Sequence, residues 1–349
     1  MSSKIISIIG ARPQFIKHAP VSVALAKKFH SVSIHTGQHY DDNMSRIFFD
    51  ELKISKPDYL LDIGKASKHG EQTALMLQQI EEILLKEKPD AVIVYGDTNS
   101  TLAGGLAAAK LQIPLVHVEA GLRSFNREMP EEINRVMADH LSAILFAPTN
   151  TAIQNLKNEG ITNGVYKTGD VMCDSLNMMK PFLKKKINEP YYFITLHRPY
   201  NTDEKERLLK ILNVLNRLNE IVLFPIHPRT SNNLKKWNVI TTDYKNINFI
   251  EPVGYNDSLS YQTFSDAVIT DSGGIQKEAY MLHKKCITIR KETEWVETLE
   301  GGCNTIVFDD LDEISQALKN HRELFFKNLY GDGHAAETIA NIIHEHFLK

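Results

Sequence analysis

Short runs of β-branched and other apolar residues alternate with longer amphipathic segments along most of this chain. The apolar runs 5–9, 91–95 and 115–118 are each followed by a segment of helical character, and the segment 70–86 has apolar residues at helical spacing. Continuous apolar strands separated by helices are typical of a parallel sheet that helices cover on both faces. The sequence therefore predicts an α/β protein.

This alternation occurs twice. It weakens near residues 168–186 and restarts with the apolar run 192–195. A chain of 349 residues is long enough for about two domains. We therefore expect two Rossmann-like domains that face a central cleft, at residues 1–170 and 171–330, with 331–349 forming a C-terminal helix that packs back on the first domain. Ligands in such folds bind beyond the carboxyl ends of the strands.

Composition argues against several classes of protein. The 40 basic and 43 acidic residues give a net charge of -3, which does not suit a general nucleic-acid binder. No apolar stretch approaches the ~18 residues of a membrane-spanning helix, and we expect no signal peptide. The cysteines, at 173, 286 and 303, have no paired spacing, which fits a reducing cytoplasm and neither a disulfide framework nor a zinc site.

Two cations follow the first apolar run. Arg12 lies at the expected turn and Lys17 lies about one helical turn further on. This pattern suits a diphosphate or another anion at a helix N-terminus, and an ordinary solvated charge pair is an equally good interpretation. The turn lacks the G-x-G-x-x-G fingerprint of a dinucleotide site.

Three carboxylates are expected at one edge of the first sheet. Asp97 and Glu119 follow buried strands, and Glu131 begins a helix after Pro130. Crowded carboxylates raise one another's pKa, which would make an acid or a base available near neutral pH. Two simpler interpretations stay open: Asp97 caps the next helix, and Glu131 complements a helix dipole.

Histidine and arginine pairs follow two strands of the second half. His197 and Arg198 come after the run 192–195, and His227 and Arg229 come after 221–226. A single histidine in such a place is more often structural. Two such pairs after successive strands favour a binding site for the substrate.

The clearest local signal is a strand that runs into Ser272, Gly273 and Gly274 and then directly into a helix. Paired glycines let a ligand approach the backbone, and the free N–H groups can hold a diphosphate. Glu278 can accept hydrogen bonds from ribose hydroxyls, and Arg290 supplies a further cation. The alternative is a tight turn that needs glycine for positive φ, and we favour anion binding.

His35 and His39 are four residues apart, but they span an expected strand and loop. They therefore form no helical metal face, and we expect no metal site.

These motifs together resemble the non-hydrolysing UDP-N-acetylglucosamine 2-epimerase family. The resemblance runs nearly end to end through GARPQFIK, HTGQH, YGDTNSTLAG, HVEAGLRS, MPEEINR, TLHR, IHPRT, TDSGGIQKEA and YGDG. It implies the two-domain GT-B fold, a cytoplasmic homodimer and no metal or nicotinamide cofactor. It also implies interconversion of UDP-GlcNAc and UDP-ManNAc by elimination and re-addition of UDP, for cell-envelope polysaccharide synthesis.

The resemblance also assigns roles to individual residues. It places Arg12 and Lys17 near the phosphate and sugar, and it makes Asp97, Glu119 and Glu131 the catalytic carboxylates. His197 would contact the diphosphate and assist the departure of UDP. The implied UDP-binding residues, with the backbone of Val253 against uracil, are Val253, Ser272, Gly273, Gly274, Glu278 and Arg290. We expect further substrate contacts from Arg198, His227 and Arg229.

The sequence departs from the common family pattern at a few places. Ala11 and Gln14 replace the threonine and glutamate of GTRPE, and the segment 293–297 reads TEWVE where TERPE is common. That variant resembles a subgroup acting on UDP-2,3-diacetamido-2,3-dideoxy-glucuronic acid, a sugar that differs at C3 and C6. This substrate is one alternative, and a GT-B glycosyltransferase is another.

Overall fold

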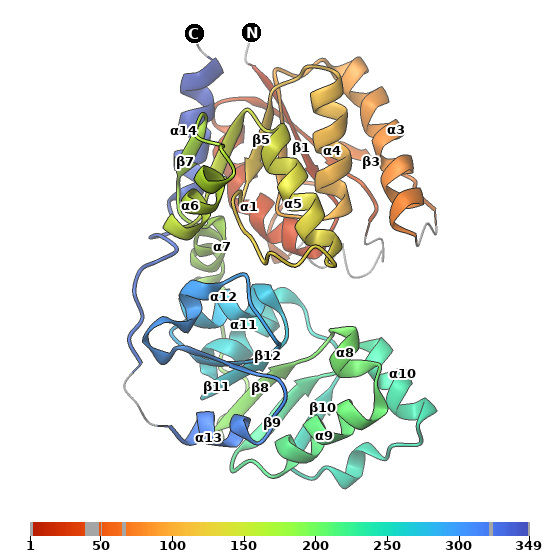
Figure 1. The fold of residues 1–349 in the computed structure, drawn as a ribbon, viewed down its shortest axis with the longest axis vertical. Coiled ribbons are helices and arrows are strands. Elements are labelled where there is room, and N and C mark those ends of the chain that lie inside the picture. Colours follow the sequence, from red (N-terminus) through yellow and green to blue (C-terminus); the bar gives the residue numbers. More distant parts are fainter. Residues whose placement is uncertain (1–2, 39–48, 50, 65–67, 321–323, 348–349) are drawn as a thin grey trace. The chain divides into compact units, whose positions relative to one another are not determined.

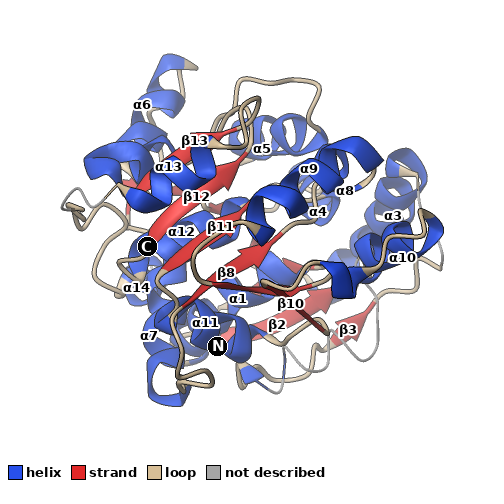
Figure 2. Ribbon diagram, turned by 90° about the horizontal axis from the view of Figure 1, so that it is seen from below, coloured by secondary structure: helices blue, strands red, loops and turns tan. Residues whose placement is uncertain are grey.

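The computed structural model describes residues 3–38, 49, 51–64, 68–320 and 324–347, and the chain divides into two compact units (Figure 1). The first unit contains residues 1–181 and 328–349, and the second contains residues 182–327. Each unit is a parallel sheet with helices on its faces (Figure 2). The α/β class predicted from the alternating pattern is therefore confirmed.

The sheet of the first unit has seven parallel strands in the order β3-β2-β1-β4-β5-β6-β7. Strands β1, β4, β5 and β6 are mostly apolar, which makes them recognisable from the sequence, whereas β3 and β7 are too short to give a pattern. The strands are β1 (Lys4–Ile9), β2 (His30–His35), β3 (Tyr59–Leu60), β4 (Ala91–Tyr95), β5 (Leu115–Val118), β6 (Ile144–Ala147) and β7 (Val165–Lys167).

Helices cover both faces of this sheet. Small residues bring α4 close to it, since a Cβ added to Gly104 would lie 2.7 Å from the Cδ1 atom of Ile8. The helices are α1 (Arg12–Ala26), α3 (His69–Glu87), α4 (Asn99–Lys110), α5 (Pro130–Leu141), α6 (Asn150–Asn158), α7 (Val171–Met179) and α14 (Ala335–Phe347).

Helix α7 occupies the region where the sequence pattern weakens. It packs against α1, and the Ser175 hydroxyl donates a hydrogen bond to the Ile16 carbonyl at 2.7 Å. The first unit therefore continues past residue 170, the boundary expected from the sequence. Helix α14 packs against α1 and α7, and the backbone N–H groups of Ala335 and Ala336 donate to the buried carboxylate of Asp174.

The second unit has six parallel strands in the order β10-β9-β8-β11-β12-β13. They are β8 (Tyr191–Thr195), β9 (Ile221–Pro225), β10 (Ile247–Ile250), β11 (Ala267–Thr270), β12 (Lys285–Ile289) and β13 (Asn304–Val307). The α-helices are α8 (Pro199–Thr202), α9 (Lys205–Asn216), α10 (Pro228–Lys236), α11 (Tyr255–Phe264), α12 (Gly273–Met281) and α13 (Glu313–Lys319). Short 3₁₀ segments lie at Lys180–Phe182, where the first unit passes into the second, at Thr241–Asp243, and at Val296–Gly302, which is kinked at Glu300 and Gly301.

The order of the strands shows where each sheet can bind a ligand. The chain turns from one side of the sheet to the other between β1 and β4 in the first unit, and between β8 and β11 in the second. Ligands of open α/β sheets bind at such switch points, beyond the carboxyl ends of the strands. Within the part of the chain that the structure describes, no helix has the length and apolar character needed to span a bilayer.

Candidate active site

Gln14 ties together the two strand ends at the switch point of the first sheet. Its Oε1 atom accepts hydrogen bonds from the N–H groups of Gly10 (2.7 Å) and Ala11 (3.1 Å). Its Nε2 atom donates to the carbonyl of Tyr95 at 2.9 Å and to the Thr101 hydroxyl at 3.0 Å. A glutamine can donate these last two bonds, which an ionised glutamate cannot. Gln14 therefore fixes the turn after β1 against the end of β4.

Glu119 and Lys17 form a buried ion pair beyond the ends of β5 and β4. The ammonium of Lys17 contacts the Oε2 atom of Glu119, and both residues are buried. Glu119 has a φ of +74°, and Gly96 has a φ of +59°. A Cβ on Gly96 would lie 3.1 Å from both charged atoms. The interpretation of Lys17 as a solvated surface charge is therefore wrong, because the cation is buried beside a carboxylate.

Asp97 is held by Arg135 of helix α5. The Arg135 guanidinium contacts the Asp97 carboxylate with Nη2 and the Oε2 atom of Glu132 with Nη1, the latter at 3.1 Å. The cap of helix α4 is Thr98, whose hydroxyl accepts from the backbone of Thr101, so the interpretation of Asp97 as that cap is wrong. Asp97 therefore keeps its carboxylate for an ion pair at the sheet edge.

Glu131 and Glu132 differ although they are adjacent on the first turn of α5. Glu131 is half-buried. Glu132 is buried and accepts hydrogen bonds from the N–H and hydroxyl of Ser124 and from the N–H of Phe125. Glu132 thus holds the preceding loop, whereas Glu131 has no comparable set of hydrogen bonds with the residues that the structure describes. Arg12 lies half-buried at the first residue of α1.

A second network lies beneath the turn at Gly96. The buried ring of His117 has Nδ1 2.7 Å from Asp139 and Nε2 2.8 Å from the Gly96 carbonyl oxygen. Arg123 pairs with the other oxygen of Asp139 at 2.7 Å. Burial alone would raise the pKa of Asp139, but hydrogen bonds and charge from His117 and Arg123 outweigh burial and hold that pKa below its ordinary value. This network fixes the turn that carries Asp97.

In the second unit, His197 and Asp271 meet across the switch point between β8 and β11. The buried Asp271 carboxylate accepts hydrogen bonds from the N–H groups of His197 and Arg198 and from the side chain of Asn201. The Nδ1 atom of His197 lies 3.1 Å from Asp271, and about half of the His197 side chain is exposed. Burial alone would raise the pKa of Asp271, but these partners hold it below its ordinary value.

Ser272 caps the helix that starts at the end of β11. Its hydroxyl accepts a hydrogen bond from the N–H of Ile275, and Gly273 and Gly274 form the first turn of α12 with negative φ. The alternative that these glycines serve a turn with positive φ is therefore wrong. A Cβ on Gly273 would lie 2.5 Å from the carboxylate of Glu294, so a larger residue there would displace that carboxylate.

Glu278 lies on α12, and Arg290 follows strand β12. The Arg290 guanidinium pairs with Glu294, with Nη2 2.9 Å from Oε2. Glu278 is buried on α12, and its carboxylate accepts a hydrogen bond from Gln262 at 2.7 Å. Burial raises the pKa of Glu278 to about 7, against the smaller effects of Gln262, Lys277 and Tyr255. Glu278 is therefore a buried acid that titrates near neutral pH.

The remaining predicted residues lie at the ends of the other strands. The exposed His227 caps α10 by accepting a hydrogen bond from the N–H of Arg229 at 3.2 Å. The Arg229 side chain is exposed and pairs with Asp203. Arg198 is half-buried directly after His197, and Val253 is half-buried before the N-terminus of α11.

Histidine, cysteine, aspartate and glutamate are the side chains that could bind a metal ion in this protein. In the described ranges, no group of three or more of these side chains could hold a metal ion. His35 accepts a hydrogen bond from the N–H of Gly37 through Nδ1 at 2.9 Å. His39, its proposed partner in the HTGQH motif, lies outside the described residues.

The chain shares its sequence with known epimerases over almost its whole length. The family model for UDP-N-acetylglucosamine 2-epimerase matches residues 22–344. The chain belongs to this family. A UDP-N-acetylglucosamine 2-epimerase homolog of Methanococcus maripaludis is 49% identical, over 97% of this chain and 99% of the relative. The UDP-2,3-diacetamido-2,3-dideoxy-D-glucuronate 2-epimerase of Pseudomonas aeruginosa is 45% identical over the same shares.

A solved epimerase structure matches the fold as well. The crystal structure of the Methanocaldococcus jannaschii UDP-GlcNAc 2-epimerase, in complex with UDP-GlcNAc and UDP, has a TM-score of 0.90 and 43% identity. The match covers 98% of this chain and 99% of that one. The resemblance indicated by the motifs is thus confirmed, and this epimerase has the GT-B fold.

Several residues that organise the candidate site were not predicted from the sequence. They are Gln14, Asn201, Asp271 and Glu294, together with Arg135. Gln14, Asp271 and Arg135 stand inside motifs that carried the resemblance, and a buried carboxylate at a strand end was a usable signal for Asp271. Their partners are distant in sequence, so spacing alone did not reveal the contacts.

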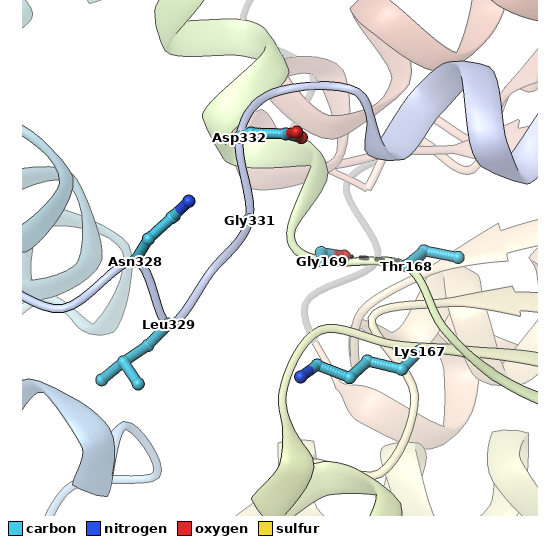
Figure 3. A pocket seen from close by; sticks show the side chains of 7 residues that line it. All are labelled: Lys167, Thr168, Gly169, Asn328, Leu329, Gly331 and Asp332. Atoms are coloured by element: carbon cyan, nitrogen blue, oxygen red, sulfur yellow. Dashed lines mark hydrogen bonds between the residues drawn. The ribbon is translucent and has the colours of Figure 1, made fainter.

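The YGDG motif of this epimerase serves the fold of the first unit. Gly331 has a φ of +95°, and the Tyr330 carbonyl accepts a hydrogen bond from the N–H of Asp170 at 2.8 Å. Figure 3 shows a pocket of about 270 Å³ beside this contact. Its lining contains none of the site residues predicted from the sequence: Lys167, Thr168, Gly169, Asn328, Leu329, Gly331 and Asp332.

Proposed function

We propose that this epimerase interconverts UDP-GlcNAc and UDP-ManNAc by eliminating UDP and adding it back, without releasing free sugar. The observation that carries the proposal is the likeness, across 98% of the chain, to an epimerase structure that holds UDP-GlcNAc and UDP. The buried Lys17–Glu119 pair and the half-buried Arg135–Asp97 pair at the switch point of the first unit support it. The product would supply cell-envelope polysaccharide synthesis.

The chemistry explains why several carboxylates are needed. A carboxylate takes the C2 proton while the C1–O bond breaks, and UDP leaves with the bonding electrons of that bond. The C2–H electrons form a C1–C2 double bond. UDP then adds back to C1 as a proton reaches C2 from the opposite face. Acid and base groups are therefore required on both faces of the sugar, and we assign these roles to Asp97, Glu119 and Glu131.

The first unit also supplies cations to this chemistry. Lys17 is positioned by its contact with Glu119, and Arg12 lies at the N-terminus of the same helix. We assign both to the sugar and the phosphate next to it. The ammonium of Lys17 therefore lies beside one of the carboxylates that we assign to proton transfer.

The second unit would retain UDP while the sugar is unsaturated. The first-turn N–H groups of α12, at Gly273 and Gly274, suit the diphosphate, aided by Arg290. His197, oriented by Asp271, contacts the diphosphate and stabilises it as UDP leaves. Glu278 binds the ribose hydroxyls and the backbone of Val253 contacts uracil. Arg198, His227 and Arg229 supply further substrate contacts.

UDP-2,3-diacetamido-2,3-dideoxy-glucuronate is the second candidate substrate. The Pseudomonas aeruginosa enzyme named for it is 45% identical to this chain, close to the identity of the M. jannaschii UDP-N-acetylglucosamine 2-epimerase at 44%. The segment TEWVE also resembles that subgroup. In the structure Trp295 packs on Lys277, whose Nζ atom lies 3.8 Å from a ring centroid.

Proton NMR with each UDP-sugar in heavy water tests the proposal. We expect the manno epimer to appear together with deuterium at C2, without free UDP accumulating in step with the product. Turnover of only the diacetamido uronate would select the second candidate. Unchanged protons at C2 with both sugars would overturn the elimination mechanism.

We further propose a cytoplasmic homodimer. The three cysteines, Cys173, Cys286 and Cys303, are reduced in the described residues, as expected in a reducing compartment. Ile133 and Met137, four residues apart on α5, are 50% and 41% exposed and offer an apolar contact. Light scattering after size-exclusion chromatography tests the dimer, and a monomer at working concentrations would exclude it.

A further inference from the structure

Phe125 has an unusual backbone conformation for its residue type. Its φ is +59°, in the left-handed region that bulky side chains rarely adopt. Seven non-glycine residues in the described ranges have positive φ: Lys53, Lys88, Gln112, Glu119, Phe125, Asn238 and His283. All except Glu119 and Phe125 end or closely follow a helical segment, where this conformation is common. Glu119 and Phe125 instead share the connection between β5 and α5.

Phe125 is also 76% exposed, although hydrogen bonds hold its loop in place. Glu132 accepts hydrogen bonds from the N–H groups of Ser124 (2.9 Å) and Phe125 (3.0 Å). Asn126 accepts from the N–H of Glu128 at 3.0 Å, and its own N–H donates to the Ser124 hydroxyl at 3.3 Å. The phenyl ring is therefore presented to solvent by a fixed backbone.

This loop is connected to Asp97. Glu132, which binds the N–H of Phe125, also pairs with Arg135, and Arg135 pairs with the Asp97 carboxylate. Phe125 also lies between Glu119 and Glu131 in the chain. Strained and exposed side chains that the surrounding structure holds in place occur at ligand-binding sites. The loop thus ties Phe125 to the carboxylates that we assign to catalysis.

We propose that Phe125 is a substrate-contacting residue whose ring packs on the apolar face of the sugar or on its acetamido methyl group. This inference rests on the proposed function. The ring gains its burial only when a UDP-sugar binds, so it contributes to affinity for the sugar and nothing to affinity for UDP alone. Its left-handed backbone lowers the stability of the free protein.

Phe125→Asn tests the proposal because asparagine tolerates positive φ and lacks the ring. We expect a higher Tm, a kcat/KM for the UDP-sugar lower by roughly tenfold to a hundredfold, and an unchanged Kd for UDP. Phe125→Tyr keeps the ring and should keep the kcat/KM. The matched control is Gln112→Asn, at φ +57° after α4, which should raise Tm and leave the kcat/KM unchanged.

Three results would overturn the proposal for Phe125. They are an unchanged kcat/KM in Phe125→Asn, weaker binding of UDP alone, or dissociation of a dimer, which would make the ring a subunit contact. A wild-type protein without hydrogen exchange at C2 would instead refute the proposed function itself. Measuring wild-type exchange first keeps the two failures distinguishable.

Discussion

The buried carboxylate of Asp271 accepts hydrogen bonds from the backbone N–H of His197 and lies 3.1 Å from the Nδ1 atom of the same histidine. One acid therefore fixes both the main chain and the ring of His197. Because Nδ1 faces Asp271, the Nε2 atom is the one left for a ligand. Asp271 acts as a positioning residue at the switch point of the second sheet.

Asp271→Asn should lower the stability of the fold. The NH₂ group of the asparagine would face N–H groups that now donate to the carboxylate. This mismatch costs about 1–3 kcal/mol in the free energy of unfolding. Because the pKa of Asp271 is lowered in the fold, its stabilisation is complete above the ordinary value of 3.8 and is lost as the pH falls below that value. Urea unfolding at pH 7 measures the cost of the substitution, and urea unfolding at acidic pH measures how much of that cost remains once Asp271 is protonated.

The difference in free energy of unfolding between wild type and Asp271→Asn should therefore shrink at low pH. A constant difference between wild type and variant at every pH would show that the ionised Asp271 contributes nothing.

Asp97→Asn, Glu119→Gln and Glu131→Gln should each reduce kcat by about 10²–10⁴-fold while UDP binding is retained. Each change removes a proton acceptor and keeps the shape of the side chain. Initial rates by NMR and UDP titration by calorimetry measure the two quantities. Glu81→Gln, on the exposed surface of α3, is the matched control. Wild-type rates in all three variants would reject the assignment.

The Lys17–Glu119 pair should contribute differently to stability and to turnover. Glu119→Gln leaves the Lys17 ammonium buried without its anion, which costs about 3–5 kcal/mol in the free energy of unfolding. Lys17→Met added to Glu119→Gln removes the unpaired charge and should recover much of that loss. Turnover should stay low in the double variant, because the carboxylate is still missing.

Chemical unfolding and NMR rates are measured on Glu119→Gln, on Lys17→Met and on the double variant, which together form a double-mutant cycle. Recovery of activity along with stability would show that Glu119 is structural.

Glu278 should make UDP affinity and stability depend on pH. Its pKa is raised to about 7, mainly by burial, and ribose hydroxyls donate to its ionised form. We therefore expect the Kd for UDP to decrease as the pH rises from 6 to 8. Glu278→Gln should remove this dependence, and titration calorimetry at several pH values measures it.

The stability effect of Glu278 has the opposite sign. Between the ordinary pKa of 4.5 and about 7, the folded protein binds this proton more tightly than the unfolded chain does. Rising pH across that range should lower the free energy of unfolding by about 3 kcal/mol. Glu278→Gln should lack this loss. If the difference in free energy of unfolding between wild type and Glu278→Gln does not change across that pH range, the raised pKa of Glu278 is ruled out.

Much of the fold follows from local sequence patterns. The runs 91–95 and 115–118 predicted their strands to the residue, because a strand covered on both faces is mostly apolar. Helices α7 and α11 were not predicted. Their stretches carry a less regular pattern, and α7 is positioned by packing on α1 and by the Ser175 contact with Ile16.

The sequence by itself determined the parallel α/β architecture, the family and the strand ends at which charged residues gather. Only the tertiary structure decided the partners of those residues: Lys17 for Glu119, Arg135 for Asp97, and Asp271 for His197. Periodicity reports which face of an element is buried, and that is a local property. Ion pairs between residues far apart in the chain depend on the order of strands in the sheet and on the backbone turn at each strand end.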